Sequence, residues 1–165
     1  MNLDIDRALS ALADNLVEHC QKKQITNPIV VGIHSGGVWV AERILSQLAT
    51  QEALATLDIT FYRDDFSRMG LHPKVKQTVL PPTEDRHVIL IDDVLMSGRT
   101  IRAAMNEIFD FGRPASISLA ILYDLHQAEL PIHADAVGEV INLSATQRIK
   151  LSGPSPLVVN VVESA

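Results

Sequence analysis

The stretch VILIDDVLMSGRT, residues 88–100, decides the fold. Its four aliphatic residues are typical of a strand that is buried on both faces, and the acid pair Asp92 and Asp93 follows directly. Ser97 to Thr100 then lead into an amphipathic helix, which the spacing of apolar residues predicts over 99–111. A buried strand, a short turn and a helix in this order are typical of a parallel α/β sheet.

The rest of the chain repeats this alternation. The patterns predict further helices over 4–22 and 38–49, and strands over 27–33, 57–65, 86–92 and 115–124. Right-handed crossovers between such strands give an α/β fold with a mostly parallel, twisted sheet flanked by helices. The C-terminal third contains only short strand-like pieces, at 136–142 and 157–162, and predicts a small irregular subdomain over the carboxyl edge of the sheet.

Composition and charge limit the classes of protein to which the chain can belong. With 165 residues, 47% of them apolar, we expect one globular domain over 1–165. The net charge of −6 argues against a large nucleic-acid surface, because phosphate binding needs clustered Lys and Arg. There is no signal-peptide pattern and no run of 18 apolar residues, so we expect a cytoplasmic protein without membrane contact. The six histidines lack the spacing of transition-metal ligands. We expect the thiol of Cys20, the single cysteine, to be unreactive and to serve only in packing.

The acid pair and the turn that follows it suggest a ligand. Ligands of open parallel sheets bind beyond the carboxyl ends of the strands, which is where Asp92 and Asp93 are expected. Two adjacent carboxylates repel each other, a cost that a cation or the two hydroxyl donors of a ribose diol would offset. The helix start at Ser97 to Thr100 offers backbone N–H groups to a phosphate. Together these features favour a binding site for a ribose 5-phosphate. The alternative is a structural role, in which an Asp only caps the helix that follows an ordinary strand.

At this point the sequence resembles a known family. VILIDDVLMSGRT is similar to the phosphoribosyl-diphosphate (PRPP) signature of type I phosphoribosyltransferases. The segments LDITFYRDDFSR, SGRTIRAAMNE, GRPASISLAILYD and ELPIHADAVG resemble the bacterial pyrimidine operon regulators that are also uracil phosphoribosyltransferases. The resemblance extends from the first helix to about residue 150. It implies the type I fold, with a mobile hood loop at about 63–83, and the conversion of uracil and PRPP to UMP and diphosphate with Mg²⁺.

The resemblance also assigns roles to residues. It implies that Asp92 and Asp93 are catalytic, bind the ribose hydroxyls of PRPP and hold Mg²⁺, partly through water or PRPP. The implied 5′-phosphate loop consists of Met96, Ser97, Gly98, Arg99 and Thr100, and the implied pyrophosphate loop of His34, Ser35, Gly36 and Gly37. Relatives commonly carry Thr-Arg-Gly in the pyrophosphate loop. In this chain the Ser35–Gly36 pair therefore replaces the cation expected to face pyrophosphate.

Two further regions receive roles by resemblance. The implied hood residues, which would cover the pyrophosphate when the loop closes, are Tyr62, Arg63, Asp64, Arg68, Lys74 and Lys76. The implied base-binding residues are Asp124, Ala136 and Val137. Met96 departs from the family, because relatives with purine substrates have an acid at this position and pyrimidine relatives often have Tyr.

The resemblance leaves alternatives open. The implied partners are PRPP, uracil, UMP or UTP, and further copies of the chain in a dimer or tetramer. One alternative is a non-catalytic or weakly catalytic, nucleotide-sensing pyrimidine regulator that binds RNA, and another is a purine phosphoribosyltransferase. Where relatives have the basic segments DRGHRELPI and ADYVGKN, this chain has DLHQAELPI and ADAVGEV, and this loss of positive charge disfavours RNA binding.

Overall fold

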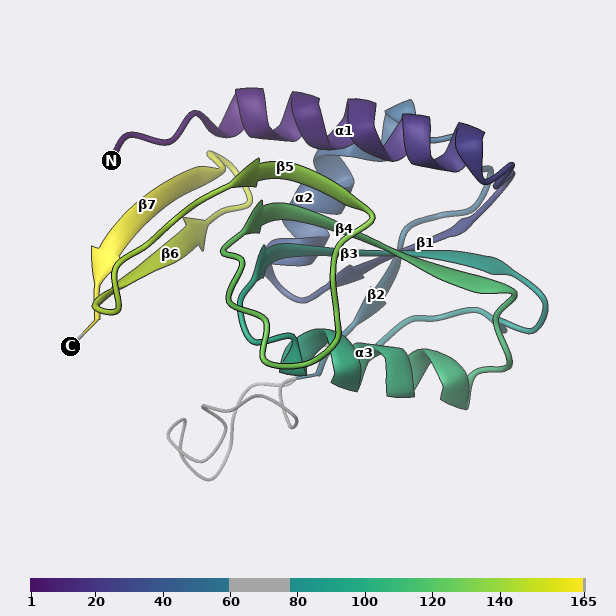
Figure 1. The fold of residues 1–165 in the computed structure, drawn as a ribbon. Coiled ribbons are helices and arrows are strands. Elements are labelled where there is room, and N and C mark those ends of the chain that lie inside the picture. Colours follow the sequence, from purple (N-terminus) through teal and green to yellow (C-terminus); the bar gives the residue numbers. More distant parts are fainter. Residues whose placement is uncertain (60–77, 165) are drawn as a thin grey trace.

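A five-stranded parallel sheet forms the centre of the molecule. The computed structural model describes residues 1–59 and 78–164. The strands are β1 (Ile29–Ile33), β2 (Ala55–Leu57), β3 (His87–Leu95), β4 (Ser116–Asp124) and β5 (Ala136–Val140). Their order across the sheet is β2-β1-β3-β4-β5, and every pair of neighbours is parallel. All carboxyl ends of the strands therefore face the same edge of the sheet (Figure 1).

Helices cover both faces of this sheet. The helices are α1 (Ile5–Lys22), α2 (Gly36–Ile44), a short 3₁₀ turn η1 (Leu45–Gln47) and α3 (Arg99–Asp110). Figure 1 shows α1 and α2 over one face and α3 over the other. The core accordingly has two parts, one that includes α1 and α2 and one that includes α3. The sequence-based expectation of a parallel sheet flanked by helices is confirmed.

The first helix shows how the sequence directs the packing. Asp4 caps it, because its Oδ1 accepts a hydrogen bond from the backbone N of Arg7 (3.0 Å). Apolar residues at helical spacing, among them Leu12 and Leu16, are fully buried against the sheet. Gly138 of β5 permits the close contact, since a Cβ there would lie 2.7 Å from the carbonyl oxygen of Ala8.

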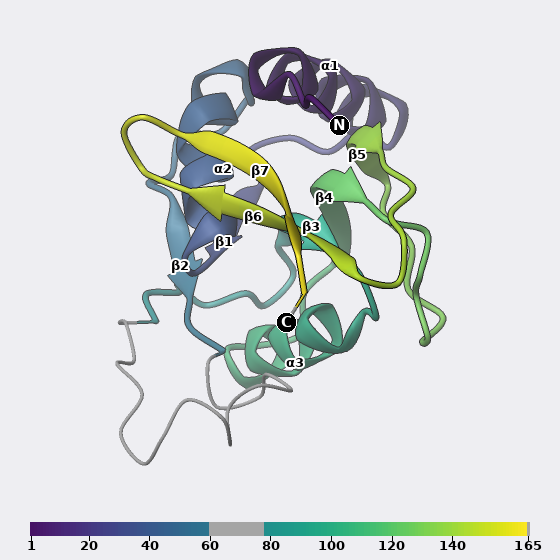
Figure 2. The ribbon, with the colours of Figure 1, turned by 90° about the vertical axis from the view of Figure 1, so that its left-hand side faces the viewer.

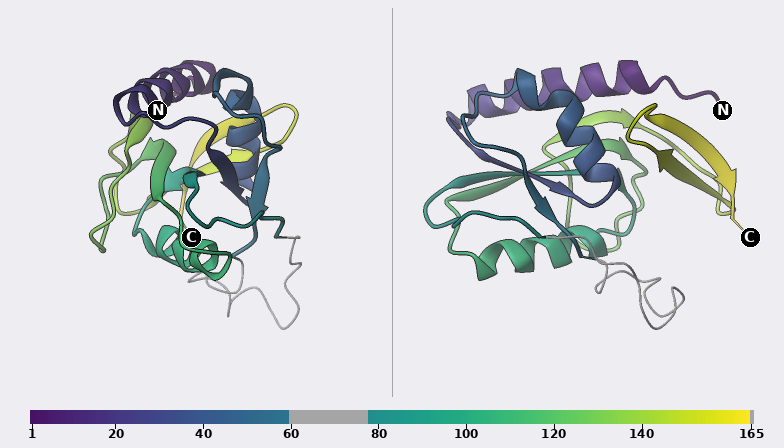
Figure 3. Two further views of the ribbon diagram at one scale, coloured as in Figure 1. Left: turned by 90° about the vertical axis from the view of Figure 1, so that its right-hand side faces the viewer. Right: turned by 180° about the vertical axis from the view of Figure 1, so that it is seen from behind.

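An antiparallel hairpin follows the sheet, formed by β6 (Gln147–Ser152) and β7 (Val158–Glu163). Figure 2 shows it crossing in front of the carboxyl ends of the central strands. Two residues of α2 anchor it. Arg43 donates a hydrogen bond to the carbonyl oxygen of Pro154 (3.2 Å), and a Cβ on Gly153 would lie 3.1 Å from the indole of Trp39. The right-hand view of Figure 3 shows α2 between α1 and this hairpin.

The structure corrects three expectations about strands: one boundary, one assignment and one omission. The strand expected over 57–65 is β2, which begins at Ala55 and ends at Leu57, while residues 60–65 lie outside the described residues. The piece at 136–142 is not part of a C-terminal subdomain, because it is β5 of the main sheet. Strand β6 was missed although its sequence, QRIKLS, alternates polar and apolar residues, a pattern with the two-residue period of a half-buried strand.

Two titratable side chains have raised pKa values, the partly buried Cys20 of α1 and the fully buried Tyr123 of β4. Burial raises the pKa of the Cys20 thiol, in keeping with the inert packing expected for it. Burial, with smaller effects from the carboxylates of Glu139 and Asp4, raises the pKa of Tyr123 to about 12. The Tyr123 hydroxyl is fully buried and has no hydrogen-bond partner among the described residues.

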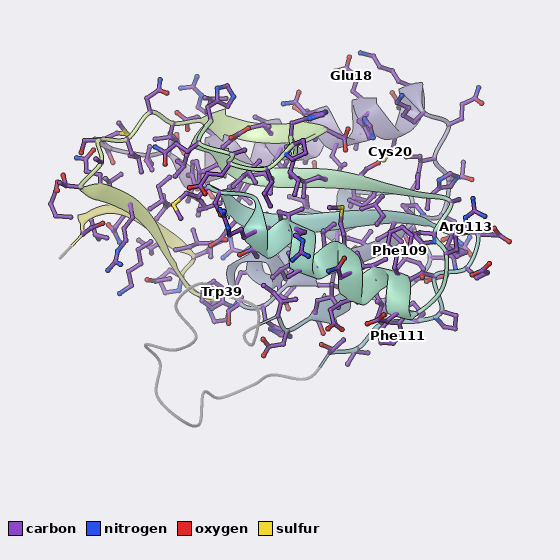
Figure 4. The ribbon with its side chains drawn as sticks, turned by 60° about the horizontal axis from the view of Figure 1, so that its bottom comes forward. Glu18, Cys20, Trp39, Phe109, Phe111 and Arg113 are labelled. Atoms are coloured by element: carbon purple, nitrogen blue, oxygen red, sulfur yellow. The ribbon has the colours of Figure 1, made fainter. Side chains whose placement is uncertain are left out.

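Figure 4 shows exposed aromatic side chains at the far end of α3. Phe109 is 56% exposed and Phe111 is 38% exposed. Within the described ranges, none of the helices has the length and apolar character needed to span a membrane.

Candidate active site

A cavity of about 550 Å³ lies at the carboxyl ends of the strands. Four segments line it: the turn between β1 and α2, the end of β3 with the turn after it, the loop after β4, and the start of β6 with the residues just before it. Figure 2 looks toward this edge of the sheet, with the hairpin in the foreground. The cavity therefore lies where parallel sheets ordinarily bind ligands.

The acid pair forms part of the wall of this cavity. The strand expected over 86–92 continues to Leu95 as β3, so Asp93 belongs to the strand together with Asp92. Asp92 is 6% exposed, and its Oδ1 accepts a hydrogen bond from the backbone N of Asp93 (2.9 Å). The Oδ1 of Asp93 accepts from the backbone N of Val94 (2.9 Å). Backbone donors thus fix the orientation of both carboxylates at the cavity wall.

The turn between β1 and α2 packs tightly against the acid pair. A Cβ on Gly36 would lie 2.5 Å from the Cγ of Asp93, and one on Gly37 would lie 2.5 Å from the carbonyl oxygen of Ile91. Any side chain at either position would push the turn away from β3. His34, Ser35 and Gly36 line the cavity, and the peptide bond between His34 and Ser35 is cis. Helix α2 begins at Gly36, so its first backbone N–H groups lie beside the acids.

The turn after β3 forms the start of α3. Gly98 has φ +92°, a conformation that disfavours other residues, and the Oγ of Ser97 accepts a hydrogen bond from the backbone N of Arg99 (3.2 Å). Met96, Ser97, Gly98 and Thr100 line the cavity. The helix start and two hydroxyl side chains therefore face the same space as the acid pair, an arrangement that suits a phosphate group.

Arg99 differs from its neighbours because it is absent from the cavity wall. Its guanidinium forms an ion pair with Glu129, and the backbone N of Glu129 donates to the carbonyl oxygen of Ser97 (2.9 Å). Both contacts join the loop after β4 to the turn after β3. In this structure Arg99 thus holds a neighbouring loop in place.

The residues expected to bind a base lie elsewhere. Asp124 is 7% exposed, and its Oδ1 accepts a hydrogen bond from the backbone N of His126 (2.8 Å). Ala136 and Val137 lie at the amino end of β5, opposite Ala120 and Ile121, and line a separate pocket of about 250 Å³ beside α1. None of these three residues lines the large cavity. Ala136 and Val137 lie at the amino end of β5, away from the carboxyl edge, whereas Asp124 ends β4 directly before Leu125, which does line the cavity.

Other residues complete the cavity wall, and the sequence-based prediction missed them. They follow the carboxyl ends of β4 and β5 or lie in the hairpin: Leu125, Gln127, Ser144, Ala145, Gln147, Arg148, Ile149 and Ser164. Leu125 and Gln127 follow a predicted strand closely, and this position was a signal that could have identified them.

The expected hood residues Tyr62, Arg63, Asp64, Arg68, Lys74 and Lys76 lie outside the described residues.

The acid pair suits a magnesium ion better than a transition metal. In the described part of the chain, no group of three or more His, Cys, Asp or Glu side chains could hold a metal ion. Mg²⁺ needs only one or two protein carboxylates when substrate phosphates and water supply its other ligands. Two adjacent, oriented carboxylates beside a turn that suits a phosphate group fit that requirement.

The chain can be compared with known proteins by its sequence and by its fold. The model of the phosphoribosyl transferase domain matches residues 2–148. The chain is 54% identical over 158 residues to a bifunctional protein PyrR of Pseudomonas fluorescens, a match that covers 95% of this chain and 94% of the relative. It is 53% identical over 152 residues to a bifunctional protein PyrR of Pseudomonas aeruginosa strain LESB58, with 92% and 89% covered.

Solved structures show the same fold at low sequence identity. A hypoxanthine-guanine phosphoribosyltransferase of Bacillus anthracis superposes with a TM-score of 0.69 at 14% identity, covering 85% of this chain and 82% of that one. A hypoxanthine phosphoribosyltransferase of Staphylococcus aureus gives a TM-score of 0.65 at 19% identity, with 84% and 76% covered. These likenesses establish the fold, and the sequence matches establish the closer kinship. The chain therefore belongs to the phosphoribosyltransferase family and, within it, to the bifunctional PyrR proteins.

Proposed function

We propose that this protein transfers the phosphoribosyl group of PRPP to uracil, giving UMP and diphosphate. One observation carries the proposal: an oriented acid pair, a glycine turn and a helix start converge on a single cavity. Each of these features matches one part of PRPP, namely the ribose diol, the diphosphate and the 5′-phosphate. The kinship with PyrR proteins favours uracil as the acceptor.

The ribose end of the substrate would lie against β3. Asp92 and Asp93 accept the hydrogen bonds of the two ribose hydroxyls through their carboxylates at the cavity wall. Ser97, Gly98 and Thr100 bind the 5′-phosphate through hydroxyl and backbone donors at the start of α3. Because the diol and the 5′-phosphate are both fixed, the ribose ring and its reacting carbon are held in one orientation in the cavity.

Phosphoribosyltransferases generally use Mg²⁺ with PRPP. In this chain Asp92 and Asp93 would hold the ion, which neutralises charge on the departing diphosphate. The protein needs no strong base for such a reaction, because the ribose carbon develops positive charge as the diphosphate leaves. Its task is to position both substrates and to exclude water from the cavity.

The base would lie at the side of the cavity formed by the loop after β4 and the start of the hairpin. Leu125 and Ile149 offer apolar surface there, and Gln127 and the backbone at Ser144 offer hydrogen-bonding groups without charge. A planar, neutral base such as uracil suits such a wall. Met96 also lines the cavity, and it matches neither the acid of purine relatives nor the Tyr of pyrimidine relatives at this position.

A panel of bases tests the proposal directly. Purified protein with Mg²⁺ and PRPP is expected to convert uracil to UMP and diphosphate, with product identified by chromatography. Hypoxanthine, guanine and xanthine serve as competing acceptors at the same concentration. Turnover of a purine with no turnover of uracil would move the assignment to purine salvage.

A further inference from the structure

The loop between β4 and β5 is attached to the turn after β3 at two separate places. At its start, the backbone N of Leu125 donates a hydrogen bond to the carbonyl oxygen of Leu95 (3.1 Å). Further along, the backbone N of Glu129 donates to the carbonyl oxygen of Ser97 (2.9 Å), and the Glu129 carboxylate forms its ion pair with Arg99. Figure 1 shows this loop running from the end of β4 to the start of α3.

Apolar packing reinforces the second attachment. A Cβ on Gly98 would lie 3.4 Å from the Cβ of Ile132 and 3.8 Å from the Cβ of Leu130. Ile132 is partly buried and packs against the part of the core that includes α3. Because Gly98 directly precedes α3 and lines the cavity, the loop rests on the turn that would hold the 5′-phosphate.

The same loop also forms part of the opposite, base-binding side of the cavity. Leu125 and Gln127 line the cavity there. Between them His126 has φ +51°, a conformation that residues other than glycine rarely adopt. Asp124 holds this bend from the strand side, since its Oδ1 accepts a hydrogen bond from the backbone N of His126 (2.8 Å). On the other side the bend is held by the contacts of Glu129, only two residues beyond Gln127.

The ion pair of Arg99 and Glu129 therefore joins two segments with different tasks. Neither side chain lines the cavity, and the two side chains are 43% and 63% exposed. An exposed ion pair contributes little to the stability of a whole domain. Its effect here is local, because it connects the turn that suits a phosphate with the loop that would face the base.

We propose that Glu129 is a positioning residue for the base: through its ion pair with Arg99 it fixes the loop after β4 against the 5′-phosphate turn. This inference rests on the proposed function, because it assumes that a base and a ribose 5-phosphate occupy the two sides of the cavity. Without the ion pair the loop samples other positions, and a ligand must order it on binding. The cost of that ordering weakens the binding of the base and leaves the phosphate site intact.

Calorimetry with two ligands, in the presence of Mg²⁺ and with the full chain, separates the two sides of the cavity. Ribose 5-phosphate carries the diol and the phosphate but no base, whereas UMP carries all three. In Glu129→Gln the Kd for UMP is expected to rise about three- to fivefold, the range for loss of an exposed ion pair, and the Kd for ribose 5-phosphate should change less than about 1.5-fold. In turnover the KM for uracil should rise by a similar factor, while kcat and the KM for PRPP stay near those of the wild type.

Another exposed ion pair offers a matched control. Glu18 pairs with Lys22 on α1 (2.9 Å), and neither residue lines the large cavity. Glu18→Gln removes the same charge and breaks the same kind of contact, and it is expected to leave both Kd values unchanged. The thermal midpoints of Glu129→Gln and Glu18→Gln should both lie within about 3 °C of the wild type, as expected for surface substitutions.

A double-mutant cycle tests whether Glu129 acts through Arg99. The quantity compared is the ratio of the Kd for UMP to the Kd for ribose 5-phosphate, because loss of the Arg99 charge weakens the field at the phosphate for both ligands alike. Arg99→Gln is expected to raise this ratio as Glu129→Gln does, and the double variant should raise it no further.

Four results would each overturn the inference: an unchanged Kd for UMP in Glu129→Gln, an equal loss for UMP and ribose 5-phosphate, the same loss in Glu18→Gln, or additive effects in the cycle. A wild-type protein that makes no UMP from uracil and PRPP would instead contradict the proposed function, whatever the variants bind.

Discussion

The side chain of Asp93 contacts three parts of the site. Its carboxylate accepts a backbone hydrogen bond from Val94, lies against Gly36 and faces the cavity. Asp93→Asn keeps the shape but removes the charge that would attract Mg²⁺ and one hydroxyl acceptor. We expect PRPP to bind about 10- to 100-fold more weakly, as measured by calorimetry with Mg²⁺. Unchanged affinity would count against the placement of the ribose.

Tyr123 is a residue whose effect concerns stability alone. Because its hydroxyl is buried without a partner among the described residues, Tyr123→Phe is expected to stabilise the protein by about 1 kcal/mol at pH 7 in urea unfolding.

The pH dependence of the same variant gives an independent check. The folded-state pKa of about 12 lies above the unfolded value of about 10, so the unfolded chain loses the phenol proton first. Below about pH 10 the hydroxyl is neutral in both states, so Tyr123 adds no pH dependence to the free energy of unfolding. Between about pH 10 and 12 only the unfolded chain ionises, and this ionisation favours unfolding. Wild-type stability should fall across that window, relative to Tyr123→Phe. Parallel curves for the two proteins would show that Tyr123 does not titrate there.

At the scale of elements, the contact between the β1–α2 turn and the end of β3 is the most sensitive to a small change. Gly36→Ala would force apart the turn and the Asp93 carboxylate. We expect activity to fall at least about 100-fold, with a thermal midpoint close to that of the wild type.

A double-mutant cycle tests the cause of that loss. If Gly36→Ala acts by displacing Asp93, the double variant Gly36→Ala/Asp93→Asn should lose little more activity than the worse single variant. Additive losses would mean that the two positions act independently, and that the methyl group harms the site in another way.

The elements also show how far the sequence predicts this protein. The strand and helix around Asp92 were predictable because a buried aliphatic run and a 3.6-residue period are strong local signals. The position of Ala136 was not, because its distance from the cavity depends on the register of β5 against β4. Arg148 was missed for a related reason: only the docking of the hairpin, held to α2 at Pro154, brings it over the sheet edge. Residues placed by pairing or docking leave no local pattern.

At the scale of the whole molecule, charge bears on the second role that PyrR kinship suggests. The net charge is −6, and the exposed loop after β4 has Gln127 and Ala128 at the positions of the His and Arg in the basic segment DRGHRELPI. Without clustered cations, binding to RNA phosphates lacks its main source of free energy. We expect no shift of a pyrimidine leader transcript by UMP-loaded protein at 150 mM salt, roughly the physiological range. A salt-sensitive shift would restore the regulatory role.

The anchoring of the hairpin on α2 has one more consequence. Trp39, the only tryptophan of the chain, lies against the hairpin at Gly153 and is labelled in Figure 4. Its indole emission therefore reports on the docking of the segment that carries Arg148. Ligands that press the hairpin down or lift it should change the intensity or colour of that fluorescence, so that occupancy can be followed in real time without any added dye.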